Sequence, residues 1–172
     1  MNSDNSALMR KAKEKFEKLY DRCVNTKWSS CSEQDTLTKF IHPLLEALGW
    51  NICDFDDMRE EVLAKLEGRD RHIDIVLYFR RNPYIGIEVK GLSFGSILHE
   101  AENRVNERCE YLFGDLLQKS KFLKVKYAVL TRFAETIIFD PSTSEAIATF
   151  RSLNEHIEKF DILWNLLSKP KT

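Results

Sequence analysis

The sequence predicts a three-layer α/β sandwich, in which helices cover both faces of a mixed central sheet. Segments with the hydrophobic period of a helix alternate with short segments rich in β-branched and aromatic residues. Their order is α-α-β-β-β-α-β-β-β-α, which places a crossover helix between two groups of strands. The 172 residues suffice for one domain with a sizeable core. Within it we expect a helical extension at 1–31, a core at 32–150 and a final helix at 151–172.

Two helices open the chain. Residues 7–23 place apolar side chains at helical spacing, with lysines between them. The second helix runs from Ser32 to Leu48. Ser32 and Asp35 have the spacing of an N-cap and its third-position partner, and Gly49 is a good stop. Pro43 lies inside this helix and is expected to kink it, because proline lacks an N–H donor.

The remaining elements follow in order. A strand is expected at 60–66, and two further strands at 72–79 and 84–89 form a hairpin around a tight Arg-Asn-Pro turn. A glycine-containing loop then leads into a long helix, whose apolar stripe begins at Leu98 and ends at Leu116. The last predicted elements are strands at 124–131, 135–140 and 145–150 and one helix at 152–168.

Composition excludes several classes of protein. The formal net charge is −1, so overall charge does not indicate a nucleic-acid partner. No apolar run approaches the ~20 residues of a membrane span, and the polar N-terminus does not resemble a signal peptide. The four cysteines form no Cys-x-x-Cys pair, which favours reduced thiols in a cytoplasmic protein. Since no membrane span is predicted, we expect no membrane partner. No phosphate-binding or dinucleotide-binding glycine motif is present.

Two groups of basic residues are visible. The first flanks the hairpin and gives weak candidates for contact with nucleic acid: Arg69, Arg71, Arg80 and Arg81. The second consists of Lys119, Lys121, Lys124 and Lys126. Each group taken alone is more typical of a solvated surface, and we predict a solvated surface for the four lysines.

The hairpin carries three charged residues where the strand pattern predicts burial: Asp74, Glu88 and Lys90. Side chains alternate between the two faces of a strand, so Glu88 and Lys90 share one face. With the turn centred near Asn82, Asp74 lies opposite the Glu88–Lys90 region and points to the same face. Two carboxylates and one ammonium group should therefore converge. A register slip of one residue would separate them.

Such a cluster suits phosphodiester chemistry. Two neighbouring carboxylates repel each other, and Mg²⁺, which prefers oxygen ligands, would relieve that repulsion. Lys90 could stabilise negative charge developing on phosphorus or orient a water molecule. The alternative is a simple ion pair on a solvent-exposed face. The flanking apolar residues Ile75, Ile87 and Val89 favour a covered pair of strands, and so favour the functional interpretation.

These residues resemble the PD-(D/E)xK nuclease superfamily, in which an Asp precedes a Glu-x-Lys on the next strand. The segment His42-Pro-Leu-Leu-Glu-Ala-Leu-Gly-Trp50 is similar to the opening helix of the N-terminal nuclease domain of type I restriction-enzyme R subunits. Ala128-Val-Leu-Thr131 and Ile137-Ile-Phe-Asp140 resemble the later strand pair of that domain. The likeness covers 32–150, and it implies a restriction-endonuclease-like fold.

The resemblance also implies an activity, a Mg²⁺-dependent endonuclease that hydrolyses DNA, with Mn²⁺ as a substitute metal. Asp74 and Glu88 would bind the metal, with the Val89 carbonyl as a further ligand, and Lys90 would be the catalytic lysine. Glu33 matches the additional acidic metal ligand of such nucleases. Its alternative role is to complement the helix dipole at an N-terminus. Glu61 is a second candidate for that outer position, and an edge-strand surface charge explains it equally well.

The chain departs from the family pattern at several places. Ile73 replaces the proline of the motif name, and Arg132-Phe133 replaces an expected Asn-Gly. Glu107 and Tyr111 match a Gln-x-x-x-Tyr motif with Glu in place of Gln, so they are accessory candidates or ordinary surface residues. RNA is an alternative substrate. The partners expected are a second copy of the chain or a separate motor or specificity subunit. The alternative function is a nucleic-acid-binding or protein-interaction module without strong catalysis.

Overall fold

Six strands form one mixed sheet, ordered β1-β2-β3-β4-β5-β6, in a computed structural model that describes residues 3–66, 69–98 and 107–171. Only β3 and β4 run parallel among the described neighbours; the other pairs are antiparallel. The strands are β1 (Met58–Leu66), β2 (Arg69–Phe79), β3 (Asn82–Val89), β4 (Tyr127–Thr131), β5 (Thr136–Asp140) and β6 (Glu145–Phe150). This confirms the predicted mixed α/β class.

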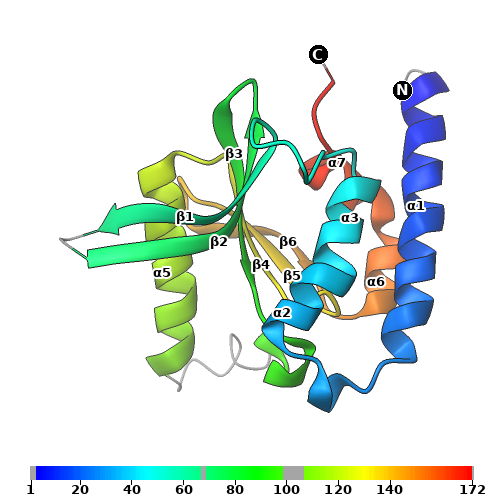
Figure 1. The fold of residues 1–172 in the computed structure, drawn as a ribbon, viewed down its shortest axis with the longest axis horizontal. Coiled ribbons are helices and arrows are strands. Elements are labelled where there is room, and N and C mark those ends of the chain that lie inside the picture. The colour runs from blue at the N-terminus through cyan, green and yellow to red at the C-terminus, as the bar shows by residue number, and fades with distance from the viewer. Residues whose placement is uncertain (1–2, 67–68, 99–106, 172) are drawn as a thin grey trace.

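Helices cover both faces of the sheet. α5 (Glu107–Leu123) lies on one face, and α1 (Ser3–Val24), α3 (His42–Ala47), α6 (Leu153–Glu158) and α7 (Phe160–Leu167) lie on the other (Figure 1). The larger apolar core fills the space between the sheet and the α1 side, where Phe16, Phe40 and Phe133 are fully buried. A smaller core lies under α5. The described elements thus form the three predicted layers.

The second predicted helix is not continuous. Its first turn is α2 (Glu33–Thr36), where Ser32 and Asp35 form the predicted capping box. A π-helical turn follows at Leu37–Ile41, and α3 begins at His42. Pro43 sits in the first turn of α3, where a missing N–H costs least. We attribute the wider turn to Pro43, since a π turn displaces the carbonyl that the proline ring would otherwise meet.

The hairpin turn lies earlier than predicted, between Phe79 and Asn82 instead of around Asn82. It consists of Arg80 and Arg81, which both have positive φ, of 52° and 65°. Two consecutive left-handed residues are the geometry of a type I′ turn, which matches the twist of the flanking strands. Arginine is unusual there, and the Asn-Pro signal drew the prediction toward the following residues.

A β-bulge restores the register that the shifted turn would have destroyed. Next to the turn, Phe79 pairs with Asn82, and a regular ladder continued from that pair would place Asp74 opposite Ile87. The register shifts by one residue between Leu77 and Tyr78, so that Ile75 pairs with Ile87. Asp74 therefore falls opposite Glu88. The bulge brings the two carboxylates to the same face of the sheet.

Two further boundaries differ from the prediction. The single last helix was wrong, because Lys159 leaves helical geometry and separates α6 from α7. The buried positions keep the same spacing across this break, so periodicity could not detect it. β4 begins at Tyr127, since Lys124 has a φ of 57° and turns the chain out of α5. Residues 99–106, within the predicted stripe of the crossover helix, lie outside the described residues.

Two more properties concern the described part of the chain. None of its helices is long and apolar enough to cross a membrane. Cys23 and Cys31 are buried free thiols, and Cys53 is an exposed one.

His156 gives a testable pH dependence of stability. Its imidazole lies between Ser152 O and Thr136 Oγ1, at 2.7 and 2.9 Å, and stacks on Phe150. Burial lowers the pKa of His156 from 6.5 to about 4. The unfolded chain therefore binds a proton near pH 6.5 that the folded chain resists until about pH 4. The stability contributed by neutral His156 is complete above pH 6.5 and is lost as the pH falls toward 4.

We expect His156→Gln to remove this pH-dependent term, which amounts to about 3 kcal/mol between those limits. Urea unfolding of both proteins from pH 7.5 to 4.5 measures it as a pH-dependent difference in unfolding free energy. His72→Gln is the matched control, because the His72 side chain is exposed. A difference that stays constant across this range would contradict the assignment.

Candidate active site

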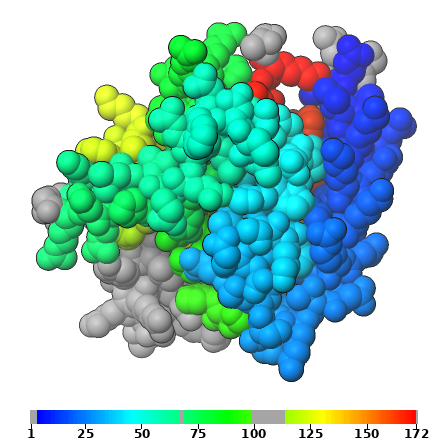
Figure 2. Space-filling view, viewed as in Figure 1, coloured from blue at the N-terminus to red at the C-terminus, as the bar shows by residue number. Residues whose placement is uncertain are grey.

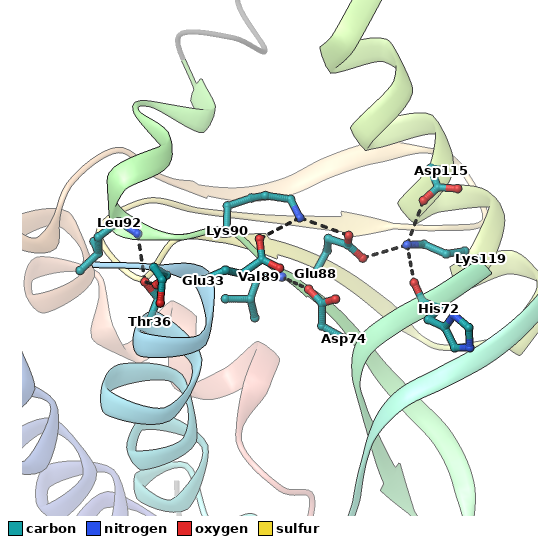
Figure 3. A network of polar contacts seen from close by, with 11 residues as sticks. Glu33, Thr36, His72, Asp74, Glu88, Val89, Lys90, Leu92, Asp115 and Lys119 are labelled. Carbon is teal, nitrogen blue, oxygen red and sulfur yellow. Dashed lines mark hydrogen bonds and ion pairs between the residues drawn. The ribbon is translucent and has the colours of Figure 1, made fainter. Parts of the chain in front are cut away.

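Glu88 and Lys90 occupy the carboxyl end of β3, in the middle of the sheet. The backbone N–H of Lys90 donates to Thr131 O on β4 at 2.8 Å, which continues the pairing beyond the strand. Lys90 Nζ lies 3.4 Å from Glu88 Oε1 and 3.4 Å from Glu33 Oε2 (Figure 3). The side chains of Glu88 and Lys90 are 13% and 12% exposed. Both charged groups are thus largely removed from solvent, but each keeps a small exposed fraction.

Asp74 approaches the same point from β2. Its Oδ2 accepts a hydrogen bond of 2.6 Å from the backbone N–H of Val89, between the two motif residues of β3. Burial raises the pKa of Asp74 to about 7, and the negative charge of Glu88 adds to the rise. The Val89 N–H and Lys90 oppose it. The structure therefore brings Asp74, Glu88 and Lys90 together, in a cluster where a second negative charge is unfavourable.

Glu33 reaches the cluster from the first turn of α2. The start of this helix is held close to the segment that follows β3: Thr36 Oγ1 accepts from the N–H of Leu92 at 2.9 Å. A Cβ added to Gly91 would lie 2.8 Å from the backbone nitrogen of Glu33, so only glycine permits this approach. In the space-filling view the light-blue surface of α2 adjoins the green surface of the residues after β3 (Figure 2). The Glu33 side chain itself is 53% exposed.

Lys119 of α5 also belongs to this cluster. A solvated surface was predicted for Lys119, and that prediction is wrong. Its side chain is 3% exposed. Nζ donates to Glu88 Oε2 at 2.8 Å and to the carbonyl of His72 at 2.7 Å, and pairs with Asp115 at 2.9 Å. Burial works to lower the pKa of Lys119, but Glu88 and Asp115 together raise it. Glu88 therefore has one lysine at each oxygen.

Lys119 was not recognised from the sequence because it is one of four closely spaced lysines, Lys119, Lys121, Lys124 and Lys126. Lys119 lies three residues after Leu116, which is fully buried, and so belongs to the inward face of α5. Lys121, five residues after Leu116, does not share that spacing, and Lys124 lies beyond the end of α5. Helical phase relative to the apolar stripe was the signal that could have separated Lys119 from its neighbours.

Arg132, noted above as a departure from the family pattern, is a structural residue. Its Nη1 donates to Leu92 O at 3.1 Å and its Nε to Glu135 at 3.1 Å. Glu135 also accepts from Ser96 Oγ and from the N–H of Ile97, each at 2.8 Å. This buried pair ties the turn between β4 and β5 to the segment that follows Lys90, and so holds that end of β3 in place.

The remaining sequence candidates lie elsewhere or outside the described side chains. Glu61 is exposed on β1, with a φ of 49°, and Arg69 is exposed at the start of β2. Arg71 lies 3.8 Å from Asp115 at the α5 side of the cluster. Arg80 and Arg81 form the hairpin turn, at the opposite end of β3 from Glu88. Glu107 and Tyr111 belong to the first turns of α5, and their side chains are not among those described.

The cluster fits a hard divalent cation in part. Asp74 and Glu88 offer carboxylate oxygens on one face. Burial raises the pKa of Asp74 first, and the charge of Glu88 adds a repulsion that a cation would relieve. Within the described residues, however, no group of three or more His, Cys, Asp or Glu side chains is arranged to hold a metal. A Mg²⁺ ion here would be held by these two carboxylates and would keep several of its waters, as Mg²⁺ commonly does.

No family model and no curated protein matches the sequence. The chain is similar to the solved structure of a fragment of a putative HsdR subunit of a type I restriction enzyme from Vibrio vulnificus YJ016, at 20% sequence identity and a TM-score of 0.44. The match covers 74% of this chain and 25% of the other, so this chain spans about a quarter of it. The similarity is too low to assign a family or an activity.

Proposed function

We propose that this protein is a metal-dependent nuclease that hydrolyses phosphodiester bonds of DNA. The observation that carries the proposal is the convergence of Asp74, Glu88 and Lys90 at the carboxyl end of β3, with Lys90 Nζ 3.4 Å from Glu88. An isolated surface ion pair would not explain a partly buried Asp74 whose pKa is raised to about 7. Perturbed carboxyl groups that share a site with a lysine are typical of catalytic centres.

Each residue has a role in this proposal. Asp74 and Glu88 would hold the divalent cation, which would supply charge neutralisation at the phosphate and activation of a water molecule. Lys90 faces both Glu88 and Glu33 over long contacts of 3.4 Å, so its ammonium group is free to move toward a phosphate oxygen. It would stabilise the negative charge that develops as the phosphodiester is attacked. Glu33 either joins the metal ligands or positions Lys90.

The sequence-independent part of substrate binding is assigned to basic side chains. Arg71 lies beside Asp115 on the α5 side of the cluster, and Arg69 precedes it on the same strand. They would contact phosphates and set the position of the backbone without reading bases. Since the three central residues act on the phosphodiester alone, RNA remains an alternative substrate. A second copy of the chain or a separate motor or specificity subunit would supply selectivity.

The second candidate function is a binding module with little catalysis. It is favoured by the pairing of Glu88, whose two oxygens each contact a lysine, at 3.4 Å for Lys90 and 2.8 Å for Lys119. A carboxylate neutralised in this way needs no metal to remain buried. The net charge of −1 gives no overall attraction to nucleic acid, which favours a protein-interaction module over a nucleic-acid-binding one.

The test is cleavage of supercoiled plasmid DNA by the full chain with Mg²⁺ or Mn²⁺. We expect nicking or cutting that stops when the metal is chelated. Lys90→Ala should slow cleavage at least about 10²-fold, because the variant lacks the positive charge that would stabilise the negative charge developing on the phosphate. Lys65→Ala, which removes an exposed lysine from β1, is the matched control and should cleave as the wild type does.

Two outcomes would decide against the proposal. Cleavage retained by Lys90→Ala would remove the site assignment. A wild-type protein that binds DNA tightly and in a salt-dependent manner without cutting it would support the binding module instead.

A further inference from the structure

We propose that Lys119 is a positioning residue of this site, which fixes the Glu88 carboxylate and offsets its charge, and so sets how tightly the site holds a divalent cation. This inference rests on the proposed function, because it concerns the same metal ligands. Nothing in the motif of Asp74, Glu88 and Lys90 calls for a second lysine. Lys119 comes from α5, on the opposite side of Glu88 from Lys90 (Figure 3).

The hydrogen bonds of Lys119 are saturated. An ammonium group has three N–H donors. Lys119 has three acceptors at short distance: Glu88 Oε2 at 2.8 Å, the His72 carbonyl at 2.7 Å and Asp115 Oδ2 at 2.9 Å. Moving this group toward a substrate would break all three contacts in a position that is 3% exposed. Lys119 is therefore fixed.

Lys90 differs in each of these respects. Its two carboxylate contacts are both 3.4 Å long, and its side chain is 12% exposed at the edge of the cluster. The two lysines accordingly have different roles. Lys90 is the group that can reach a reacting phosphate, and Lys119 is the group that holds a ligand in place.

Lys119 makes the two oxygens of Glu88 unequal. Lys119 binds Oε2, so Oε1 is left with the single long contact to Lys90 and is the oxygen presented to a metal. The positive charge 2.8 Å from Oε2 also reduces the attraction of Glu88 for a cation. Removing the charge while keeping the side-chain volume should strengthen metal binding and release the carboxylate from its fixed orientation.

The experiment titrates the 172-residue protein with Mn²⁺ by calorimetry and measures plasmid cleavage at saturating Mn²⁺. We expect Lys119→Met to bind Mn²⁺ about tenfold more tightly, since one nearby positive charge is lost. We expect the same variant to cleave at least about tenfold more slowly, because Glu88 is no longer held. Lys121→Met is the matched control: this exposed lysine of the same helix contacts Ser144, and both measurements should be unchanged.

A second variant gives the opposite sign and does not depend on how Lys119→Met folds. Asp115→Asn removes one negative charge and leaves Lys119 on Glu88, so it should weaken Mn²⁺ binding about threefold. Structural damage alone would weaken binding in Lys119→Met as well, whereas charge offset predicts that the two variants shift in opposite directions. Lys119→Arg, which keeps the charge, should bind Mn²⁺ as the wild type does.

The results separate this inference from the proposed function. If the wild type binds Mn²⁺ and cleaves DNA, but Lys119→Met shows unchanged or weaker binding, the inference is wrong and the nuclease assignment stands. If the wild type neither binds Mn²⁺ nor cleaves, the proposed function fails and the inference fails with it.

Discussion

Asp74→Asn is expected to reduce metal-dependent DNA cleavage at least about 10³-fold and, at the same time, to stabilise the protein at pH 8. Activity falls because an amide binds a divalent cation far more weakly than a carboxylate does. The fold should survive, since the amide oxygen can accept the 2.6 Å hydrogen bond that Asp74 receives from the Val89 N–H. Plasmid cleavage and urea unfolding measure the two effects on the same preparation.

The sign of the stability change follows from the pKa of Asp74. In the folded protein it is raised from 3.8 to about 7, first by burial and then by the charge of Glu88. Between these values the folded chain keeps a proton that the unfolded chain releases, so stability is lost as the pH rises from 3.8 to 7. At pH 8 the cost of the charged Asp74 is on the order of 4 kcal/mol, and the neutral amide removes it. At pH 4 the variant and the wild type should differ little.

Asp70→Asn is the matched control. It makes the same chemical change on the same strand, at an exposed position near the start of β2, and should alter neither cleavage nor the pH dependence of stability. An Asp74→Asn protein that retains a tenth of wild-type cleavage would contradict the metal assignment. One that is less stable than the wild type at pH 8 would contradict the electrostatic argument.

The convergence of Asp74 and Glu88 shows both the reach and the limit of sequence reasoning. Strand alternation correctly grouped the two carboxylates with Lys90. The turn position used to derive that grouping was nevertheless wrong, and the structure recovers the grouping through the bulge between Leu77 and Tyr78. A bulge has no reliable sequence signal, because it depends on cross-strand packing and on the twist that the turn imposes. The earlier turn and the bulge shift the register in opposite senses, so that Asp74 still faces Glu88.

Features that depend on local chemistry were predictable, and those that depend on tertiary packing were not. The capping box at Ser32 and Asp35 follows from hydrogen bonds within one turn, and the N-cap spacing of the two residues predicted it. The burial of Lys119 depends on acceptors from three other places in the chain: Glu88, Asp115 and the His72 carbonyl. Helical spacing from Leu116 could have indicated that Lys119 faces inward, but not which acceptors its ammonium group meets. Its role became visible when β2, β3 and α5 were brought together.

Gly91→Ala is expected to lower the free energy of unfolding by about 2 kcal/mol and cleavage by at least about tenfold. The backbone conformation of Gly91, with φ −62° and ψ 149°, suits alanine, so strain within residue 91 is not the cause. The cause is the neighbour. The new methyl group would lie 2.8 Å from the backbone nitrogen of Glu33 and 3.0 Å from the carbonyl carbon of Ser32. Neither atom belongs to a flexible side chain.

The start of α2 must therefore move away from β3, and Glu33 must move with it. That displacement breaks the contact between Glu33 and Lys90, together with the bond from the Leu92 N–H to Thr36 Oγ1. Urea unfolding and plasmid cleavage measure the two losses. If Glu33 binds the metal, the variant should also need more Mn²⁺ for half-maximal cleavage. If Glu33 only positions Lys90, the rate at saturating metal should fall while the metal requirement stays the same.

Gly114→Ala supplies the control for the substitution itself. A Cβ at Gly114 meets nothing within 4 Å, and the residue lies inside α5, where alanine is the better helix former. Gly114→Ala should therefore raise the free energy of unfolding by about 0.5–1 kcal/mol and leave cleavage unchanged. The same chemical change thus has opposite effects at two glycines, because one is packed against the backbone of α2 and the other faces open space. A Gly91→Ala protein as stable and as active as the wild type would show that the close approach of α2 to β3 does not hold Glu33 at the site.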